Sequence, residues 1–475
     1  MARSVPSLYS DVVAERSQVV VLAAGRGTRM RSRLPKVLHH LAGRALVAHP
    51  VAAATEATGA TPVVVVAPDQ EQAVAALLGD AATLVTQPQA RGTGDALRSV
   101  PERLRSSGTV VVLSGDVPLV RAATLGALLR AHADGGAACT LLAVESHDPA
   151  GLGRVVTDPE GRATRVVEER DLEAGSPAAS SRLCNAGVYA FQGARLWPAL
   201  ERLTDDNAQG EVYLTDVVAL LAPATVVTAA DAEEALGVND RRQLAAAETA
   251  LRRRTLDGLM LQGVTVEDPA TTYVDAGVVV GPDTVLRPMS VLRGGTCIGE
   301  GCEIGPMARL SDVRAGRGVR IGASWLEGCE LGDGVEVGPY ARIRPGTRLE
   351  EGVYIGTHAE VKNSTVGAGS KVSHFSCVLD SDLGREVNFS AGAVTCSYDG
   401  FDKARISIGD GVFVGSDCML VAPLRVGAGA YLAAGSVITK DVPAGALAVE
   451  RAEQRNIAGW AERRRARVLS TTLGG

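Results

Sequence analysis

The hydrophobic residues follow one pattern in residues 17–239 and another in the later part of the chain. Short β-branched runs occur at residues 19–22, 63–66, 110–113 and 141–144. The segments between them, such as residues 70–78 and 122–133, have helical spacing. Runs this short and apolar are typical of parallel strands buried on both faces. The pattern predicts a doubly wound, Rossmann-like α/β domain over residues 17–239.

From residue 263 the hydrophobic period changes to six. Aliphatic residues recur at every sixth position in two series, Leu331, Val337, Ile343, Leu349, Ile355 and Val361, and Ile408, Val414, Leu420, Val426, Leu432 and Ile438. This spacing fits a chain that winds in three flat faces around a narrow core, with small residues at the corners. It predicts a left-handed parallel β-helix over residues 263–449, with a loop leaving the coil near residues 395–405.

The segments outside these two domains have compositions of their own. Residues 240–262 are rich in Ala, Leu and Arg and contain no Pro, which predicts a linker helix. Residues 1–16 lack the apolar core of a signal peptide and are predicted to be a disordered N-terminus. Residues 450–475, with an RRRAR run, are predicted to be a solvated C-terminal tail.

Composition narrows the expected surroundings. The net charge is −6, which argues against nucleic acid as a partner. No apolar run reaches 18 residues, so no membrane span is expected. The eight cysteines include no CxxC pair, which favours free thiols in a reducing compartment over a cysteine metal site. We therefore expect a cytoplasmic protein.

The most informative motif follows the first predicted strand. The strand runs into LAAGRGTRM, residues 22–30, and then LPK, residues 34–36. A glycine-rich turn after a strand lets backbone N–H groups approach a phosphate, and a following helix start favours the anion. Arg29 and Lys36 would add positive charge at the phosphates. A structural βα turn is the alternative.

This combined pattern resembles the sugar-phosphate nucleotidyltransferases, and further motifs follow in the order that this family needs. Gln87 with the GTG at residues 92–94 resembles the segment that reads uracil. Asp116 ends a predicted strand, where Mg²⁺ bound to a triphosphate favours a hard oxygen ligand, and Asn239 resembles the second metal ligand. Taken singly, Asp116 also fits a helix cap. The nucleotide and sugar contacts that the resemblance implies are Leu22, Ala23, Ala24, Gly25, Lys36, Gln87, Gly92, Thr93, Gly153, Glu168, Asn185 and Asn239.

The reaction of this family is the attack of a sugar phosphate on the α-phosphorus of UTP, with pyrophosphate leaving. The attacking phosphate is already anionic near neutral pH, so no general base is needed. Catalysis then consists of positioning and charge neutralisation by Arg29, Lys36 and Mg²⁺. Two residues depart from relatives: Ala186 where many carry Thr, and Asp95 where some carry His.

The six-residue period also brings charged residues into register. Arg344 and Lys362 are 18 residues apart, so they are predicted at the same corner of adjacent coils, about 4.8 Å apart. Two stacked cations repel unless an anion lies between them, and a sugar phosphate would fit. Two solvated surface charges are the alternative. His374 could accept a proton from an amine near neutral pH, and Glu360 is expected to hold its other ring nitrogen.

This neighbourhood resembles the acetyltransferase domain of the bifunctional N-acetylglucosamine-1-phosphate uridyltransferases/glucosamine-1-phosphate acetyltransferases, and the resemblance runs from Val19 to Trp460. It implies a homotrimer that makes UDP-N-acetylglucosamine, a precursor of peptidoglycan and lipopolysaccharide, from glucosamine-1-phosphate, acetyl-CoA and UTP with Mg²⁺. The catalytic residues would be His374, Glu360, Arg29 and Lys36. The implied acceptor contacts are Arg344, Lys362, Cys377 and Asn388, and the implied acetyl-CoA contacts are Ala391, Ser397, Tyr398, Ser416, Ala434 and Arg451.

Three positions depart from the acetyltransferase pattern: Cys377 replaces a phosphate-binding Tyr, Ser397 an Asn and Ser390 a Gly. Losing one hydroxyl contact to phosphate costs about 1.5–3 kcal/mol, so we expect weakened rather than abolished acetyl transfer. Two alternatives remain open. One is a monofunctional uridyltransferase with a structural β-helix, and the other is a scaffold protein in which both sites are vestigial.

Overall fold

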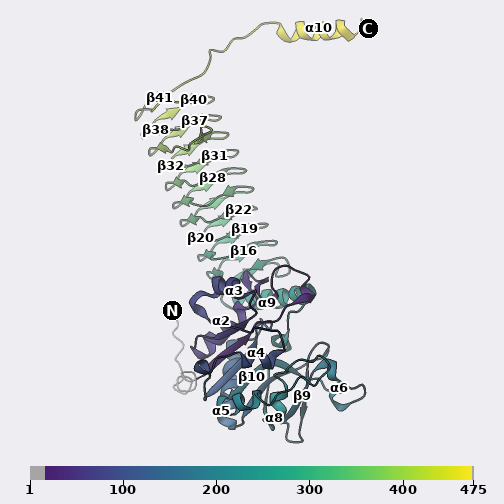
Figure 1. Ribbon diagram of the computed structural model, residues 1–475. Coiled ribbons are helices and arrows are strands. Elements are labelled where there is room, and N and C mark those ends of the chain that lie inside the picture. Colours follow the sequence, from purple (N-terminus) through teal and green to yellow (C-terminus); the bar gives the residue numbers. More distant parts are fainter. Residues whose placement is uncertain (1–16, 473–475) are drawn as a thin grey trace. The chain divides into compact units, whose positions relative to one another are not determined.

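The computed structural model describes residues 17–472, and the chain divides into two compact units that join between Thr255 and Leu256 (Figure 1). The predicted disordered segment 1–16 lies outside the described residues. Within residues 17–472, no helix is both long and apolar enough to cross a membrane.

The N-terminal unit is built on one nine-stranded sheet. The strand order is β11 (Thr225–Thr228), β7 (Cys139–Glu145), β10 (Leu183–Gln192), β6 (Thr109–Ser114), β1 (Gln18–Leu22), β4 (Val63–Val66) and β5 (Thr83–Thr86). In addition, β8 (Arg154–Thr157) pairs with β10, and β9 (Ala163–Val167) pairs with β8. The strands β5, β4, β1 and β6 are parallel, and β10 runs antiparallel to β6 and β7.

Both faces of this sheet are buried. On β1, Val20 and Leu22 belong to one hydrophobic cluster, whereas Val19 and Val21 belong to the cluster on the opposite face. The covering helices are α2 (Ala48–Thr58), α3 (Glu71–Leu78), α4 (Thr93–Arg98), α5 (Ala122–Gly135), α6 (Pro177–Ser180), α7 (Gly193–Leu200) and α8 (Asp216–Leu220). The doubly wound α/β prediction is confirmed, because continuous apolar runs suit strands covered on both sides.

The sheet also determines where a ligand can bind. The chain proceeds outward from β1 to β4 and β5, and then returns to the other side of β1 with β6. The carboxyl ends of β1 and β6 therefore lie side by side, with Leu22 paired to Ser114. Crevices form at such reversals of strand order, so the turns that follow these two strands are well placed for binding.

A single helix, α9 (Arg241–Leu261), occupies the segment for which a linker helix was predicted. Ala247 and Ala250 pack with Leu41 and Leu119 in the N-terminal unit. The last turns contribute Leu256 and Leu259 to the core of the C-terminal unit.

The C-terminal unit is a left-handed parallel β-helix with three faces, and every third strand belongs to the same face. Face 1 contains β12 (Thr265–Val266), β15 (Val285–Leu286), β18 (Glu303–Ile304), β21 (Arg320–Ile321), β24 (Glu336–Val337), β27 (Tyr354–Ile355), β30 (Lys371–Val372), β33 (Asn388–Phe389), β36 (Phe413–Val414), β39 (Tyr431–Leu432) and β41 (Leu447–Ala448). Face 2 contains β13 (Tyr273–Val274), β16 (Val291–Arg293), β19 (Arg309–Ser311), β22 (Trp325–Glu327), β25 (Arg342–Ile343), β28 (Glu360–Lys362), β31 (Cys377–Leu379), β34 (Val394–Cys396), β37 (Met419–Val421) and β40 (Val437–Ile438). Face 3 contains β14 (Val279–Val280), β17 (Cys297–Ile298), β20 (Arg314–Ala315), β23 (Glu330–Leu331), β26 (Arg348–Leu349), β29 (Thr365–Val366), β32 (Ser381–Leu383), β35 (Ile406–Ile408) and β38 (Leu424–Val426).

The six-residue series form the core of this β-helix. Leu331, Val337 and Ile343 lie on faces 3, 1 and 2 in turn, and each is buried. The predicted β-helix is confirmed. The expected extruded loop lies between β34 and β35, where Tyr398 and Lys403 form an antiparallel bridge.

The predicted solvated tail contains an element that the sequence analysis did not anticipate. The helix α10 (Trp460–Thr472) follows an irregular stretch, and residues 451–469 are exposed. Exposure agrees with a solvated tail, but the run of Arg and Ala is helical because both residues have high helix propensity.

Core burial gives a first prediction. Phe389 is fully buried in the β-helix, whereas Phe401 in the extruded loop is 92% exposed. Phe389→Ala is expected to destabilise the β-helix by about 3–5 kcal/mol through lost burial and a cavity. Phe401→Ala, the matched control, is expected to change stability by less than about 0.5 kcal/mol. Urea unfolding of the β-helix measures both, and equal losses would contradict the assigned core.

Candidate active sites

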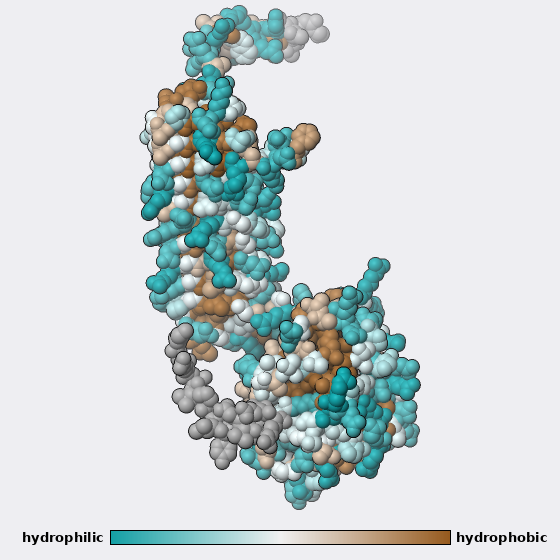
Figure 2. Space-filling view, turned by 60° about the vertical axis from the view of Figure 1, so that its left-hand side comes forward, coloured by the Kyte–Doolittle hydropathy of each residue, from teal (hydrophilic) through white to brown (hydrophobic). Residues whose placement is uncertain are grey.

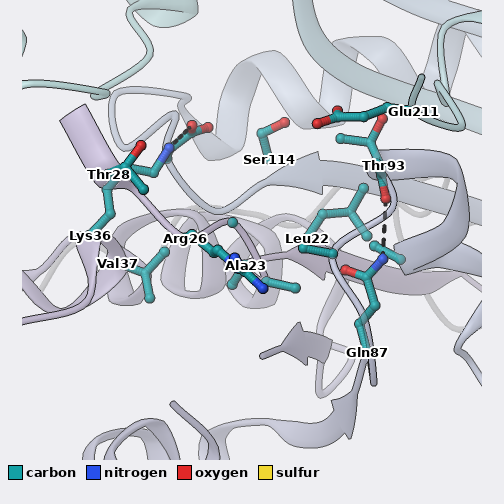
Figure 3. Close-up of a pocket in the computed structure, with 16 residues that line it drawn as sticks. Leu22, Ala23, Arg26, Thr28, Lys36, Val37, Gln87, Thr93, Ser114 and Glu211 are labelled. Carbon is teal, nitrogen blue, oxygen red and sulfur yellow. Dashed lines mark hydrogen bonds and ion pairs between the residues drawn. The ribbon is translucent and has the colours of Figure 1, made fainter. Parts of the chain in front are cut away.

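A cavity of about 510 Å³ opens at the carboxyl ends of β1 and β6 (Figure 3). Of the residues predicted to bind nucleotide, it is lined by Leu22, Ala23, Ala24, Gly25, Lys36, Gln87, Gly92, Thr93 and Asp116. Sequence reasoning missed Arg26, Thr28, Ser114 and Glu211, which also line it. Two of these, Arg26 and Thr28, lie within the glycine-rich motif itself, so their place in the motif could have identified them as cavity residues.

Arg29 differs from its neighbours in the same motif. It lies in the 3₁₀ helix η1 (Thr28–Met30), and its side chain is exposed. Among the described residues around the cavity, Arg26 contributes to the lining and Arg29 does not. A phosphate-binding role for Arg29 therefore stays a prediction.

The glycine-rich turn needs glycine for two reasons at Gly27. The residue has φ 60°, a left-handed conformation that residues with a side chain rarely adopt. A Cβ atom there would also clash with the side chain of Lys36. Glycine thus lets the turn after β1 pack directly against the segment that carries Lys36.

Lys36 joins three segments that are far apart in the sequence. Its Nζ donates to Asp116 Oδ2 at 2.5 Å and to Asn239 Oδ1 at 3.0 Å. The Lys36 side chain is only 9% exposed, so its charge depends on these oxygens for compensation. The backbone adds a further link, because Val238 N–H donates to the Asp116 carbonyl at 2.8 Å.

The predicted sugar contacts form a second cluster in the N-terminal unit. Asn185 N–H donates to the Gly153 carbonyl at 2.9 Å. Glu168 Oε1 accepts from Thr215 Oγ1 at 3.0 Å, and Asn185 Nδ2 donates to the Tyr189 hydroxyl at 2.6 Å. Burial raises the pKa of the Glu168 carboxyl. The structure therefore brings Gly153, Glu168 and Asn185 together.

In the β-helix, the turns between faces 1 and 2 stack four of the six predicted acetyl-CoA residues in one column with His374, whereas Ser397 and Tyr398 follow β34 on face 2. Gly392 N–H donates to the His374 carbonyl, and Asp417 N–H donates to the Ala391 carbonyl one coil further on. Ser416 and Ala434 occupy the next turns, and Arg451 donates to the Ala434 carbonyl at 3.1 Å. We call His374, Ala391, Ser416, Ala434 and Arg451 the histidine column.

The turns between faces 2 and 3 carry a separate group, which we call the cation column: Arg344, Lys362, Ser397, Tyr398 and Lys403. The Lys403 ammonium contacts Lys362 and lowers its pKa, and Arg344 adds to this effect. Ser397 Oγ donates to Asp380 Oδ2 at 2.9 Å, which anchors the extruded loop beside the cations. The predicted stacking of Arg344 and Lys362 is present, because Arg344 N–H donates to the Val361 carbonyl.

The predicted contact between Glu360 and His374 is absent within one chain. In the described part of the chain, Glu360 makes an ion pair with Arg344 at 2.9 Å, and no hydrogen bond joins it to His374. Glu360 begins β28 on face 2 in register with Arg342, so Arg344 lies two residues beyond its register partner. Cys377 pairs with Glu360 on that face and is half-buried, whereas Asn388 lies on face 1.

Comparison with known proteins agrees with this division into two sites. Residues 19–231 match the family model described as MobA-like NTP transferase domain, and residues 328–363 match bacterial transferase hexapeptide (six repeats). The chain therefore combines a nucleotidyltransferase domain with a hexapeptide-repeat transferase domain.

Several relatives match the chain over almost its whole length. The chain is 46% identical to the bifunctional protein GlmU of Pelobacter propionicus, over 94% of this chain and 98% of that protein. It is 48% identical to the bifunctional protein GlmU of Thermobifida fusca and 47% identical to that of Streptomyces avermitilis, over 94% of each chain. The chain belongs to the GlmU family of bifunctional enzymes, which confirms the predicted family over the monofunctional alternative.

The burial of Glu168 gives a second prediction. Its raised pKa means that the folded protein binds this proton more tightly than the unfolded chain does. At pH values between the pKa of Glu168 in the unfolded chain and its higher pKa in the folded protein, the folded state therefore loses stability as pH rises. Glu168→Gln cannot ionise and should remove this part of the pH dependence.

Urea midpoints of the N-terminal unit, taken from about pH 4 to about pH 7, measure this difference. The exposed Glu160, changed to Gln, is the matched control and should behave as the unmodified protein does. An unchanged pH slope in Glu168→Gln would show that the Glu168 carboxyl is not the buried acid responsible.

Proposed function

We propose that the N-terminal unit transfers uridylate from UTP to N-acetylglucosamine-1-phosphate and releases pyrophosphate. The observation that carries this proposal is Lys36, a nearly buried ammonium at the floor of a cavity beside a glycine-rich turn. A phosphate oxygen of the sugar phosphate attacks the α-phosphorus, and the bond to pyrophosphate breaks. The attacking oxygen already carries a negative charge, so the protein needs only to position it and neutralise the phosphates.

The proposed Mg²⁺ ligands are Asp116 and Asn239, and their geometry fits a cation. One carboxylate oxygen and one amide oxygen converge on the same ammonium of Lys36, so a positive charge is already stabilised at this point. Mg²⁺ is commonly bound by one or two protein oxygens, with water and substrate phosphate completing its coordination. When bound, it would neutralise charge on the triphosphate.

We propose that the sugar of the acceptor binds beside Gly153, Glu168 and Asn185. The Glu168 carboxyl and the Asn185 amide offer hydrogen-bonding groups suited to sugar hydroxyls and to an N-acetyl group. Because Thr215 holds one oxygen of Glu168, the other oxygen remains available for a ligand.

For the C-terminal unit we propose acetyl transfer from acetyl-CoA to the amine of glucosamine-1-phosphate. The amine nitrogen attacks the thioester carbon, His374 accepts the proton that the amine loses, and the bond to sulfur breaks so that CoA leaves as a thiolate, which takes up this proton to give the free thiol. Arg344, Lys362 and Lys403 would hold the sugar phosphate, since these neighbouring cations favour an anion between them. Within one chain Glu360 would fix the Arg344 guanidinium, and its predicted contact with a His374 ring would have to form in a shared site.

The two columns support a homotrimer with shared acetylation sites. The histidine column and the cation column lie at different corners of one β-helix, separated by face 2, so one chain does not bring His374 next to Lys362. A second copy that faces the first can bring a histidine column against a cation column.

The surface of the β-helix supports self-association as well. Tyr340, His358 and Phe375 stack on successive coils with ring centroids 5.3 and 5.2 Å apart, and Tyr340 and Phe375 are 58% and 63% exposed. Hydrophobic surface runs along several coils of the face seen in Figure 2. Contiguous apolar surface of this kind is typical of interfaces.

The two activities can be separated by single substitutions. Lys36→Ala is expected to lower pyrophosphate release from UTP and N-acetylglucosamine-1-phosphate by about 10²–10³-fold, because a positioned charge is lost. His374→Ala is expected to lower thiol release from acetyl-CoA and glucosamine-1-phosphate by about 10²–10⁴-fold, because the general base is lost. Each variant serves as the folding control for the other. Loss of both activities in one folded variant would contradict the assignment of one reaction to each unit.

A shared acetylation site can be tested by complementation. His374→Ala and Lys362→Ala chains should each be inactive in thiol release when expressed alone. In trimers mixed from these two variants, some sites combine an unmodified histidine column with an unmodified cation column. When equal amounts of the two chains mix at random, about a quarter of the sites are of this kind, so about a quarter of the unmodified activity should return. Trimers mixed from two different His374 variants are the control. No recovery in verified mixed trimers would show that each site lies within one chain.

A further inference from the structure

Gln87 is a buried amide at the edge of the nucleotide cavity, and two neighbours fix its orientation. It follows β5, lines the cavity and is only 3% exposed. Its Nε2 donates to Asp95 Oδ2 at 2.8 Å and to the Gly92 carbonyl at 3.3 Å. Asp95 lies in the first turn of α4 and Gly92 directly precedes this helix, so both partners of the amide nitrogen come from the start of α4.

Both partners can only accept hydrogen bonds. An ionised carboxylate and a backbone carbonyl have no proton to donate, so each requires the NH₂ group of Gln87. If the amide were rotated by 180°, its oxygen would face two other oxygens, one of them charged. The amide oxygen is therefore left as the group that can meet a ligand, and in Figure 3 it points away from the hydrogen-bonded nitrogen, toward Ala23.

A fixed acceptor distinguishes between pyrimidine bases. Uracil presents an N3–H donor between two carbonyls, whereas cytosine presents an N3 acceptor beside an amino group. A Gln87 oxygen that cannot exchange places with its nitrogen can accept from uracil N3–H but repels the lone pair of cytosine N3. Sites built to hydrogen-bond one partner reject a mismatched partner because a buried polar group is left unpaired.

We propose that Asp95 is a specificity-determining positioning residue, which holds the Gln87 amide so that its oxygen selects the imide N–H of uracil. This inference rests on the proposed uridylyl transfer and adds the residue that determines the choice of base. The competing explanation is structural. Asp95 lies in the first turn of α4, where a carboxylate also stabilises the positive end of a helix.

The test is Asp95→Asn, which keeps the shape of the side chain but offers both a donor and an acceptor. The Gln87 amide is then held in its original orientation by the Gly92 carbonyl alone, at 3.3 Å, so the rotated orientation becomes accessible. Pyrophosphate release is measured with UTP and with CTP as the nucleotide, at the same Mg²⁺ concentration. The ratio of kcat/KM for UTP to kcat/KM for CTP is expected to fall by about tenfold, mainly through a lower KM for CTP and a higher KM for UTP.

A structural role alone predicts another result. Loss of helix stability would lower the rates with UTP and CTP by the same factor and leave their ratio unchanged, and that outcome would overturn the proposal. Glu102→Gln, which removes a first-turn carboxylate from the neighbouring 3₁₀ helix η4 (Glu102–Leu104), is the matched control and should leave the ratio unchanged.

Equilibrium binding of UTP and CTP separates failure of this inference from failure of the proposed function. If the unmodified protein releases no pyrophosphate with UTP, the uridylyl transfer proposal fails. The ratio of the dissociation constants for CTP and UTP still tests the role of Asp95 in that case. The unmodified protein should bind UTP more tightly than CTP, and Asp95→Asn should narrow this difference about tenfold. Equal binding of the two nucleotides by the unmodified protein would overturn the inference.

Discussion

The N-terminal site depends on one buried ammonium and the oxygens that compensate its charge. Lys36 lies between Asp116 and Asn239, so the segment that carries Lys36, the end of β6 and the segment before α9 meet at a single cation. A charge with this little exposure is stable only when hydrogen-bonded partners surround it. The same requirement brings two hard oxygens together beside the nucleotide cavity, which Lys36 and Asp116 line and Asn239 does not.

The β-helix imposes a different constraint, which is repetition. Parallel strands place equivalent residues of successive coils one above another, so functional residues that occupy the same turn become columns. His374 and Ala391 belong to one column and Arg344 and Lys362 to another, with Glu360 and Cys377 on the face between them. This separation of the two columns makes a second chain part of the proposed acetylation site. The register partner of Glu360 is Arg342, and Arg344, two residues further along the chain, lies within reach of the Glu360 carboxylate.

Two of the positions that the sequence analysis marks as departures from the family pattern, Ser397 and Asp95, take part in hydrogen bonds near the proposed sites. Ser397 donates to Asp380 and thereby holds the extruded loop beside Lys362. Asp95 accepts from Gln87 and thereby fixes an amide that lines the nucleotide cavity. In both cases a short polar side chain orients a neighbouring group. A position that differs from relatives can therefore keep or adjust the chemistry of a site without touching the ligand itself.

The sequence by itself determined the two folds, because hydrophobic periodicity is a local property: buried parallel strands and a six-residue spiral each leave their own pattern. It also identified the glycine turn, since the residues of that motif are contiguous. Only the tertiary structure decided that Lys36 meets Asn239, 203 residues away, that Glu360 pairs with Arg344, and that Asp95 holds Gln87. These contacts depend on side-chain direction and on register between strands, and neither is recorded in the order of residues along the chain.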